Sequence, residues 1–387
     1  MKKARILHLG KFYPPSSGGM ETALATLCRG ERGQVENRAL VLNNRRRTVH
    51  QVVDGVAVTR VGRLVTIGSV SIAPTLPLWL ARAKADVIVL HEPNPMALVA
   101  YFLVRPESPL IVWYHSEVIR PTWRYRLFYK PFLEFALRRA ERIVVASPPM
   151  RDVSALAPYR KKCVVVPYGL DLQRYQATPA LAARAEGLCH GLRGPVLLFV
   201  GRLVQYKGVE VLLRALPGLD AQMVIVGDGP LRDGLGRMAR ELGLIDRVRF
   251  VGQVTDEELL AWYYACDALV LPSISRQEAF GLVQLEAMLC GRPVVSTDLP
   301  TGVPWINQHE HTGLVVDPGD AAALRRALVR LVCDADLRRR LGENARARAV
   351  SQFAADDMCR AAIRLYRDVC PEGLPLQTLE AGELSLP

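Results

Sequence analysis

Several features that mark other classes of protein are scarce or absent in this chain of 387 residues. The longest uncharged run, residues 64–81, contains a glycine and two prolines, so it predicts a loop with short elements and no membrane span. Gly and Pro number 29 and 26, too few for collagen or a low-complexity chain. The N-terminus enters an apolar stretch shorter than the core of a secretory signal, so we expect a cytoplasmic protein.

Cysteine and metal-ligand patterns are also missing. The eight cysteines have no C-x-x-C spacing and most lie in apolar segments, so we expect free thiols and no zinc site. An Asp-x-Asp triplet that binds a metal ion would be expected directly after a strand. Here the triplet Asp334 to Asp336 follows a helical pattern and is typical of a helix N-cap. We therefore expect neither a metal ion nor a cofactor.

Charge is distributed unevenly along the chain. Half of the residues are apolar and 23% are charged, which excludes a disordered protein. The net charge of +12 divides into +15 for residues 1–180 and −3 for residues 181–387. This asymmetry predicts an anionic surface or ligand for the first part of the chain.

Thirteen short apolar segments without polar alternation recur along the chain. Such segments are typical of strands in a parallel sheet that is covered on both faces. Helical patterns separate them, for example at residues 256–265, and this alternation predicts βαβ units. The predicted strands are residues 5–10, 38–42, 56–61, 86–91, 110–114, 143–147 and 163–167, and then 196–201, 222–227, 247–252, 268–272, 293–297 and 313–316.

Thirteen strands are too many for one doubly wound sheet, so we expect an α/β protein with two Rossmann-like domains. The first would comprise residues 1–180 and the second residues 181–370, followed by a tail at 371–387. The last helix, near residues 354–369, can cross back to the first domain. Ligands of such sheets bind at the carboxyl ends of the strands, so two facing domains would form one interdomain cleft.

Residues 10–21 follow the first predicted strand and contain the pair Gly18-Gly19. Two glycines before a helix permit close approach of the backbone and leave amide N–H groups that can bind an anion. An ordinary strand-to-helix turn explains the pair equally well.

Residues 201–208 follow the first strand of the second series. Arg202 and Lys207 lie at the end of this strand, and Gly208 permits a tight start of the next helix. Two cations at this position can neutralise a diphosphate, the arginine as a fork and the lysine as a point charge. The alternative is a pair of solvated surface cations.

Residues 278–288 place two glutamates eight positions apart. Glu278 lies just before a predicted helix that begins near Gly281, and Glu286 lies on that helix. The free amides near Phe280 would attract phosphate. A glutamate beside a helix end is also a common partner of the helix dipole, so this spacing alone is a weak signal.

Together these segments resemble retaining glycosyltransferases of family 4, which have the GT-B fold. The E-x7-E motif of the family stands at Glu278 to Glu286, its G-R-L-x-x-x-K-G motif at residues 201–208 and its G-G-x-E motif at residues 18–21. Residues 227–230 and 300–304 match as well, and the resemblance covers about residues 4–370. It implies two Rossmann-like domains and transfer of a hexose from a nucleoside diphosphate sugar with retention of configuration.

The resemblance also implies roles for individual residues. Arg202 and Lys207 would bind the donor diphosphate, while Glu278 approaches the donor sugar and Glu286 binds the ribose. The glycine pair would lie near the phosphates and the acceptor. The predicted catalytic set is His115, Arg202, Lys207 and Glu278, and the predicted donor-binding set is Gly18, Gly19, Arg202, Lys207, Gly252, Glu278, Phe280, Gly281, Leu282 and Glu286.

Three histidines lie in or after predicted strands. His115 ends a strand, and in the family a histidine of this region lies near the transferred sugar; a purely structural hydrogen bond is the alternative. His91 ends another strand, where it could contact the acceptor or be structural, and His8 inside a strand is expected to be structural. Residues 115–120 resemble the mannosyl- and rhamnosyl-transferase branch, although Glu117 stands where aspartate is more common.

That branch implies GDP-mannose or a related GDP-sugar as donor, with UDP-glucose or UDP-N-acetylglucosamine as the alternative. The acceptor would be a polyprenyl-diphosphate-linked or other saccharide in the synthesis of a cell-surface polysaccharide. Residues 123–139 combine aromatic and basic side chains. They predict either peripheral docking on the anionic inner face of the cell membrane or a core-facing helix with a solvated basic face.

Other functions fit less well. A nicotinamide-dependent dehydrogenase needs G-x-G-x-x-G, and residues 227–232 have arginine in place of the third glycine. A non-catalytic subunit of a polysaccharide assembly complex would be expected to lose site residues, and the predicted set is complete. Nucleic acid would suit the basic surface, but no recognition motif accompanies it, so we do not expect it as a partner.

Overall fold

The computed structural model describes residues 3–16, 18–67, 70–118 and 123–370, and its chain folds into two α/β domains. The predicted tail at 371–387 lies outside the described residues. The first domain is built on a sheet with strand order β10-β9-β8-β7-β1-β2-β4-β3, parallel except for β3. Its elements are β1 (Arg5–Leu9), α1 (Gly19–Gly30), β2 (Glu36–Leu42), β3 (Val49–Val53), β4 (Val56–Val61), β5 (Val65–Ile67), β6 (Val70–Ile72), α2 (Leu76–Arg82), β7 (Val87–Glu92), α3 (Pro95–Val104), β8 (Leu110–Tyr114), α4 (Trp123–Phe128), α5 (Lys130–Arg139), β9 (Arg142–Val145) and β10 (Cys163–Val165).

The second domain has a parallel sheet of order β13-β12-β11-β14-β15-β16. Its helices begin with side-chain caps where the sequence provides them, as at Thr255 before α9 and Asp334 before α13. The elements are α6 (Pro179–Cys189), β11 (Val196–Val200), α7 (Val209–Ala215), β12 (Gln222–Val226), α8 (Arg232–Glu241), β13 (Val248–Gly252), α9 (Asp256–Ala265), β14 (Ala268–Leu271), α10 (Leu282–Leu289), β15 (Val294–Thr297), α11 (Val303–Ile306), β16 (Gly313–Val316), α12 (Ala321–Cys333), α13 (Ala335–Gln352) and α14 (Ala355–Val369).

Helices cover both faces of each sheet. Consecutive residues of a strand point to opposite faces, so each strand contributes to two apolar layers. In the first domain Ile6 faces α1 and α14, whereas Leu7 faces the layer formed by α2, α3 and α5. In the second domain Leu198 packs on the side of α9, α10 and α13, and Leu197 on the side of α7, α8 and α12. One apolar cluster includes the α1 side of the first sheet and the α10 side of the second.

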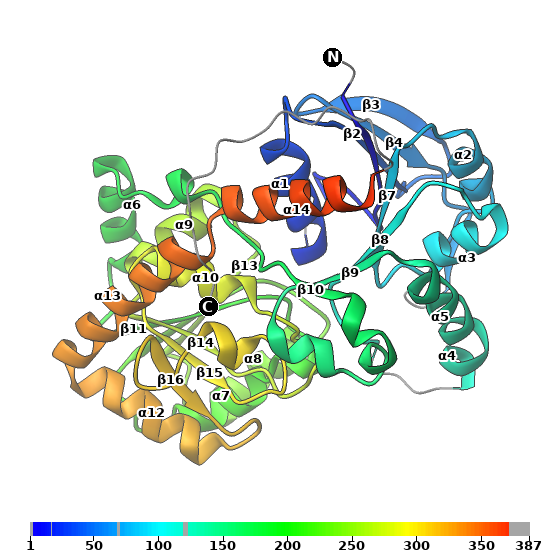
Figure 1. Ribbon diagram of the computed structural model, residues 1–387. Coiled ribbons are helices and arrows are strands. Elements are labelled where there is room, and N and C mark those ends of the chain that lie inside the picture. Colours follow the sequence, from blue (N-terminus) through cyan, green and yellow to red (C-terminus); the bar gives the residue numbers. More distant parts are fainter. Residues whose placement is uncertain (1–2, 17, 68–69, 119–122, 371–387) are drawn as a thin grey trace.

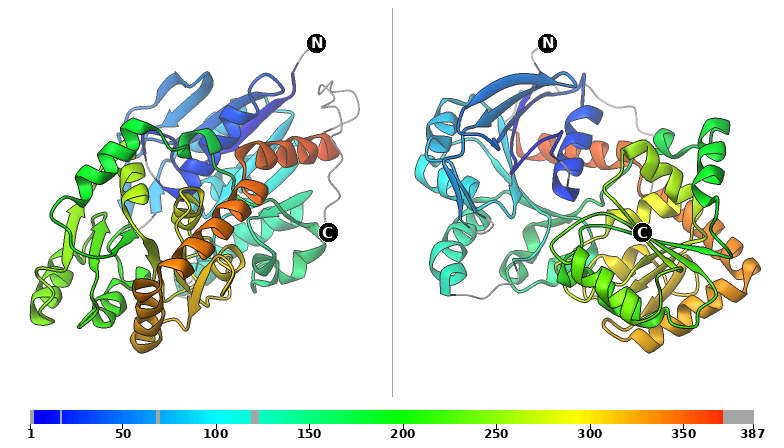
Figure 2. Two further views of the ribbon diagram at one scale, coloured as in Figure 1. Left: turned by 90° about the vertical axis from the view of Figure 1, so that its left-hand side faces the viewer. Right: turned by 180° about the vertical axis from the view of Figure 1, so that it is seen from behind.

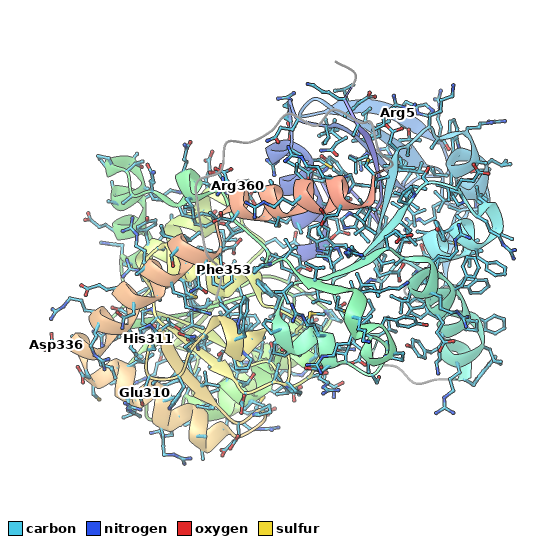
Figure 3. The ribbon with its side chains drawn as sticks, in the orientation of Figure 1. Arg5, Glu310, His311, Asp336, Phe353 and Arg360 are labelled. Carbon is cyan, nitrogen blue, oxygen red and sulfur yellow. The ribbon has the colours of Figure 1, made fainter. Side chains whose placement is uncertain are left out.

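The chain crosses between the domains twice, and the two crossings touch. After β10 the first crossing passes through Leu170, and the second leads from α13 through Phe353 into α14, which packs on α1 of the first domain (Figures 1–3). The amide of Leu170 donates to the Phe353 carbonyl at 2.9 Å, and the amide of Ala355 donates to the Leu170 carbonyl at 2.9 Å. A side chain at Gly169 would clash with the carbonyl of Ala354, which explains glycine at this point.

All thirteen predicted strands are present, with ends that differ by a few residues. The structure adds β3 and the hairpin β5–β6, which lies within the segment predicted to be a loop with short elements. Asp334 caps α13 through the amide of Leu337, as predicted. The eight cysteines are free thiols, and Cys333 is exposed. In the described part of the chain, none of the helices is both long enough and apolar enough to span a membrane.

Candidate active site

Three glycines mark the carboxyl ends of neighbouring strands in the second sheet. Gly201 follows β11, Gly227 follows β12 and Gly252 ends β13. Gly227 has a positive φ of 128°, and a Cβ atom there would clash with the backbone of Gly201. Its amide donates to the carbonyl of Gly252 at 2.7 Å. The backbone is therefore tightly packed at the edge of the sheet where a nucleotide is expected.

A buried ion pair lies beside this edge. The Lys207 ammonium group, in the short turn before α7, lies 2.6 Å from the Glu278 carboxylate, which also accepts a hydrogen bond from Ser273 at 2.9 Å. Both charged side chains are about one-tenth exposed. Burial by itself lowers the pKa of Lys207, but the adjacent Glu278 outweighs it and the net pKa lies above the ordinary value. Lys207 is therefore a permanent cation at neutral pH.

The E-x7-E motif, Glu278 to Glu286, leads into α10 at the boundary with the first domain. Gly281 has a φ of 75° and precedes the helix, and Phe280 is buried against the interdomain cluster. A Cβ atom at Gly19, the first residue of α1, would lie 3.4 Å from Cδ1 of Leu282. The N-termini of α1 and α10 therefore lie close together. The free amides and dipoles of both helices favour an anion at this place.

Glu286 is held by two tyrosines. Its carboxylate accepts hydrogen bonds from Tyr263 at 2.5 Å and from Tyr175 at 3.2 Å, the latter residue belonging to the first crossing. Burial raises the pKa of Glu286 although both hydroxyls donate to it. A ribose bound here would share the carboxylate with these two hydroxyls.

His115 is attached to the same region through one tyrosine. Its Nδ1 lies 2.5 Å from the hydroxyl of Tyr168, and its Nε2 lies 2.8 Å from Nδ1 of His91. The ring of Tyr168 contacts that of Phe280 with a centroid separation of 4.8 Å. Burial lowers the pKa of His115 to about 3, so the ring is neutral. The structure thus connects His115 to the beginning of α10.

The other two histidines that lie in or after predicted strands, His91 and His8, are internal. Neither has any exposed surface. This burial agrees with the structural role expected for His8 and favours the structural alternative for His91, because no ring atom of His91 reaches the surface to meet an acceptor.

Not every predicted site residue takes part in this cluster. Arg202 is exposed just after β11, in the segment that leads to Lys207. An ion pair between the domains involves Glu117, whose carboxylate lies 3.8 Å from the guanidinium of Arg276. Among the described residues no group of histidine, cysteine and carboxylate side chains has the arrangement of a metal site.

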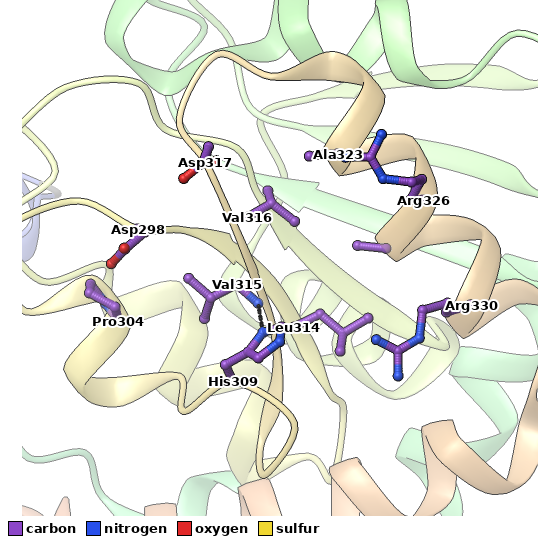
Figure 4. Close-up of a pocket in the computed structure, with 11 residues that line it drawn as sticks. Asp298, Pro304, His309, Leu314, Val315, Val316, Asp317, Ala323, Arg326 and Arg330 are labelled. Atoms are coloured by element: carbon purple, nitrogen blue, oxygen red, sulfur yellow. Dashed lines mark hydrogen bonds between the residues drawn. The ribbon is translucent and has the colours of Figure 1, made fainter.

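A cavity of about 610 Å³ lies elsewhere, at the outer edge of the second sheet between β16 and α12 (Figure 4). His309 accepts a hydrogen bond there from the amide of Val315, and Arg330 is paired with Glu310. None of the residues predicted for the donor site lines this cavity.

Sequence reasoning missed the residues that hold the predicted ones. Ser273 orients Glu278, Tyr168 binds His115, and Tyr175 with Tyr263 binds Glu286. Ser273 and Tyr168 follow strands β14 and β10, a position that could have identified them. Tyr263 lies on α9, and only the tertiary fold brings its hydroxyl to Glu286 of α10.

Comparisons with known proteins show which family the chain belongs to. Residues 17–174 match the model of Glycosyltransferase Family 4, and residues 190–348 match that of Glycosyl transferases group 1. The chain is 37% identical to the D-rhamnosyltransferase WbpZ of Pseudomonas aeruginosa over 360 residues, covering 91% of this chain and 92% of that protein. It is 32% identical to the O-antigen chain mannosyltransferase C of Escherichia coli, covering 94% and 98% of the two chains.

Solved structures show the same fold. Anabaena Alr3699/HepE in complex with UDP has a TM-score of 0.75 and 23% identity, covering 95% of this chain and all of that one. Sucrose-phosphate synthase of Thermosynechococcus elongatus has a TM-score of 0.79 and 23% identity, with 95% and 99% coverage. The architecture is GT-B, and the chain belongs to the family 4, group 1 glycosyltransferases.

Proposed function

We propose that this glycosyltransferase transfers a mannosyl or related hexosyl group from a GDP-sugar, with retention, to a saccharide acceptor in surface polysaccharide synthesis. The observation that carries the proposal is the buried Lys207–Glu278 pair beside the glycine-rich strand ends of the second sheet. The two relatives named as rhamnosyl- and mannosyltransferases support a donor of the mannose type. A UDP-glucose or UDP-N-acetylglucosamine donor is the alternative.

Positive charge at this place serves the departure of the nucleotide. When the bond between the anomeric carbon and the phosphate oxygen breaks, its electron pair stays on the diphosphate. Lys207, Arg202 and the helix N-termini would stabilise this growing charge, and Glu278 would face the sugar. Because these groups supply positive charge, we expect no requirement for a metal ion, and transfer should persist in EDTA. A non-catalytic subunit would have no reason to keep this pair buried.

Thermal-shift measurements with nucleotides test the donor. Binding at 100 times the Kd adds about 2.7 kcal/mol of stability, so GDP should raise Tm clearly. Lys207→Met should reduce the shift, whereas Lys84→Met, which removes an exposed cation of the first domain, should leave it unchanged. A shift with UDP and none with GDP would reverse the choice of base, and no shift with either would remove the proposal.

The stereochemistry has its own test. The product should keep the anomeric configuration of the donor sugar, which NMR coupling constants report directly. An inverted product would contradict the retaining mechanism and leave the family assignment intact.

We also propose that the first domain docks on the anionic inner face of the cell membrane, where a lipid-linked acceptor would be found. In α4 the side chains of Trp123, Leu127 and Phe128 are 61%, 62% and 64% exposed. The next helix, α5, buries Leu133 and Leu137 and exposes basic residues. It is therefore a core-facing helix with a solvated basic face, the alternative to membrane docking that the sequence offered. The apolar surface is therefore confined to α4 in the described part of residues 123–139.

The first domain also has a cluster of basic residues around a cavity. This cavity of about 580 Å³ is lined by Arg151, Arg160, Lys161 and Lys162, which suits the phosphate of a lipid headgroup. Each Lys or Arg near an anionic bilayer contributes about 1 kcal/mol of attraction. Residues 119–122 and the side chain of Arg124 lie outside the described part of the chain.

Cosedimentation with liposomes tests the docking. Binding should require anionic lipid and weaken as salt rises. It should fall in a variant with Gln at Arg126, Lys130, Arg138 and Arg139, and persist in a matched variant with Gln at the exposed second-domain residues Arg214, Arg237, Arg240 and Arg340. Equal binding to neutral liposomes, or none at low salt, would reject membrane docking without affecting the transferase assignment.

A further inference from the structure

A buried chain of side-chain hydrogen bonds runs through the first sheet from the candidate site to α1. His115, His91 and His8 lie at the carboxyl ends of β8, β7 and β1, which are neighbours in the sheet. The His115–His91 contact is 2.8 Å and the His91–His8 contact is 3.1 Å, and all three rings are nearly or wholly buried. Neighbouring rings have centroids 5.1 and 5.4 Å apart.

The far end of the chain fixes its direction. The side-chain amide of Asn37 donates from Nδ2 to Glu31 at 2.9 Å and to the Cys28 carbonyl at 3.4 Å. Its Oδ1 therefore faces Nε2 of His8 at 3.2 Å and accepts a hydrogen from it. Glu31 also accepts a hydrogen bond from Tyr366 of α14.

Each histidine then determines the tautomer of the next. A neutral imidazole has one N–H and one lone pair, so a hydrogen on Nε2 of His8 leaves Nδ1 as an acceptor for His91. His91 in turn offers its own Nδ1 to Nε2 of His115. Nδ1 of His115 is left with a lone pair, which accepts from the Tyr168 hydroxyl. Burial lowers the pKa of His8 to about 4 and that of His115 to about 3, which keeps these rings neutral.

We propose that His8 and His91 are positioning residues that hold His115 in its Nε2–H tautomer, so that Nδ1 offers a lone pair to a hydroxyl of the donor sugar. This inference rests on the proposed function. In the present conformation the Tyr168 hydroxyl occupies that lone pair. Tyr168 belongs to the first crossing and contacts Phe280 of the second domain, so a movement between the domains can withdraw it.

A matched pair of substitutions at His91 separates positioning from packing. In His91→Asn the amide oxygen occupies the place of Nδ1 and can still accept from His115. Leucine has nearly the shape of asparagine but no hydrogen-bond acceptor. Compared with His91→Asn, His91→Leu therefore lacks only the acceptor that faces Nε2 of His115. The asparagine variant should retain the tautomer and the leucine variant should lose it.

Long-range ¹H–¹⁵N spectra of the full chain with labelled histidine report the tautomer without any substrate. His115 signals are identified by their loss in His115→Gln. The wild type should show hydrogen on Nε2 and none on Nδ1. Tyr168→Phe should leave this pattern unchanged, because His91 sets it. A wild-type ring protonated at Nδ1, a tautomer that survives His91→Leu, or one that changes in Tyr168→Phe would overturn the proposal, and the first and third results do not depend on whether His91→Leu folds.

Kinetics provide the second readout. In His91→Leu we expect KM for the donor to rise about tenfold, which corresponds to the loss of one hydrogen bond. We expect little change in kcat, because this hydrogen bond is made in both the ground state and the transition state. His91→Asn should lie within about threefold of the wild type, because its acceptor is kept. A fall in kcat alone, equal in both variants, would indicate a structural role. Absence of transfer by the wild type from every donor would contradict the proposed function, while the spectra would still decide the tautomer.

Discussion

The two domains share an architecture but place their polar side chains differently. In the second sheet the adjacent strands β11 and β14 are wholly apolar, and the chemistry lies in the segments that follow them, at Lys207, Ser273 and Glu278. The first sheet carries polar groups within its strands, above all His8 and His91. Sequence motifs locate chemistry in loops after strands, whereas chemistry inside a sheet becomes visible only when the strand order is known.

This difference has an energetic consequence. Burying a polar group costs free energy unless it is hydrogen-bonded, and within the first sheet each histidine depends on the next. The ion pair of the second domain depends on two side chains, Lys207 and Glu278, from the segments that follow the neighbouring strands β11 and β14. We therefore expect substitutions in the second domain to affect turnover most, and substitutions in the first domain to affect pH dependence.

The largest effect is expected at the ion pair. Glu278→Gln removes the negative charge that faces Lys207 and should lower kcat about 10²–10³-fold, the range seen when a charge-stabilising group is lost. Glu210→Gln, at an exposed position of α7 in the same domain, should leave kcat unchanged. Steady-state kinetics with the preferred donor measure both. Equal activity of the two variants would contradict the role given to Glu278.

An intermediate effect concerns pH and the first domain. Burial raises the pKa of Glu31 to about 8, so the folded state keeps a proton that the unfolded state loses above about pH 4.5. Stability from this group is present at low pH and falls as pH rises from about 4.5 to 8. The neutral histidines act in the opposite sense, since the unfolded state gains their protons below about pH 6.5.

Glu31→Gln should therefore reduce the loss of stability between pH 5 and pH 8, because the amide is neutral throughout. Urea unfolding at the two pH values measures the change, and Glu107→Gln, an exposed loop substitution, is the control. If both variants lose as much stability as the wild type between pH 5 and pH 8, Glu31 is not protonated in the folded state.

The smallest effects belong to the aspartate triplet on α13. Asp334→Ala removes the N-cap bond to Leu337 and should lower the free energy of unfolding by about 1 kcal/mol. Asp336 forms an exposed pair with Arg339, so Asp336→Ala should cost less than about 0.5 kcal/mol. Neither should alter kcat. A large loss of activity in either variant would instead indicate a functional role for this triplet.

Much of the fold was predictable, because buried parallel strands are continuous apolar segments. The strand β3 was missed because it is an edge strand with exposed residues such as Val52, and the hairpin β5–β6 because its strands have only three residues each. The E-x7-E and G-R-L-x-x-x-K-G motifs pointed to Glu278 and Lys207 because local sequence places both after strands.

The histidine chain could not be predicted in this way. Its members are separated by 83 and 24 residues, and nothing local indicates that β1, β7 and β8 are neighbours. A weak signal was available: His8, His91 and His115 each lie two residues after a residue that faces α1 and α14, namely Ile6, Val89 and Trp113. Alternation thus places all three on one face of the sheet, but their order across it comes only from the fold.

The measurement that tests the account most directly is sugar transfer from GDP-mannose by the double variant Arg202→Ala, Lys207→Ala. If these cations stabilise the departing diphosphate, kcat should fall by at least about 10²–10³-fold while donor binding weakens less. Circular dichroism and the Tm should show that the variant is folded. Full activity of the folded double variant would contradict the central claim that this pair of cations drives the transfer.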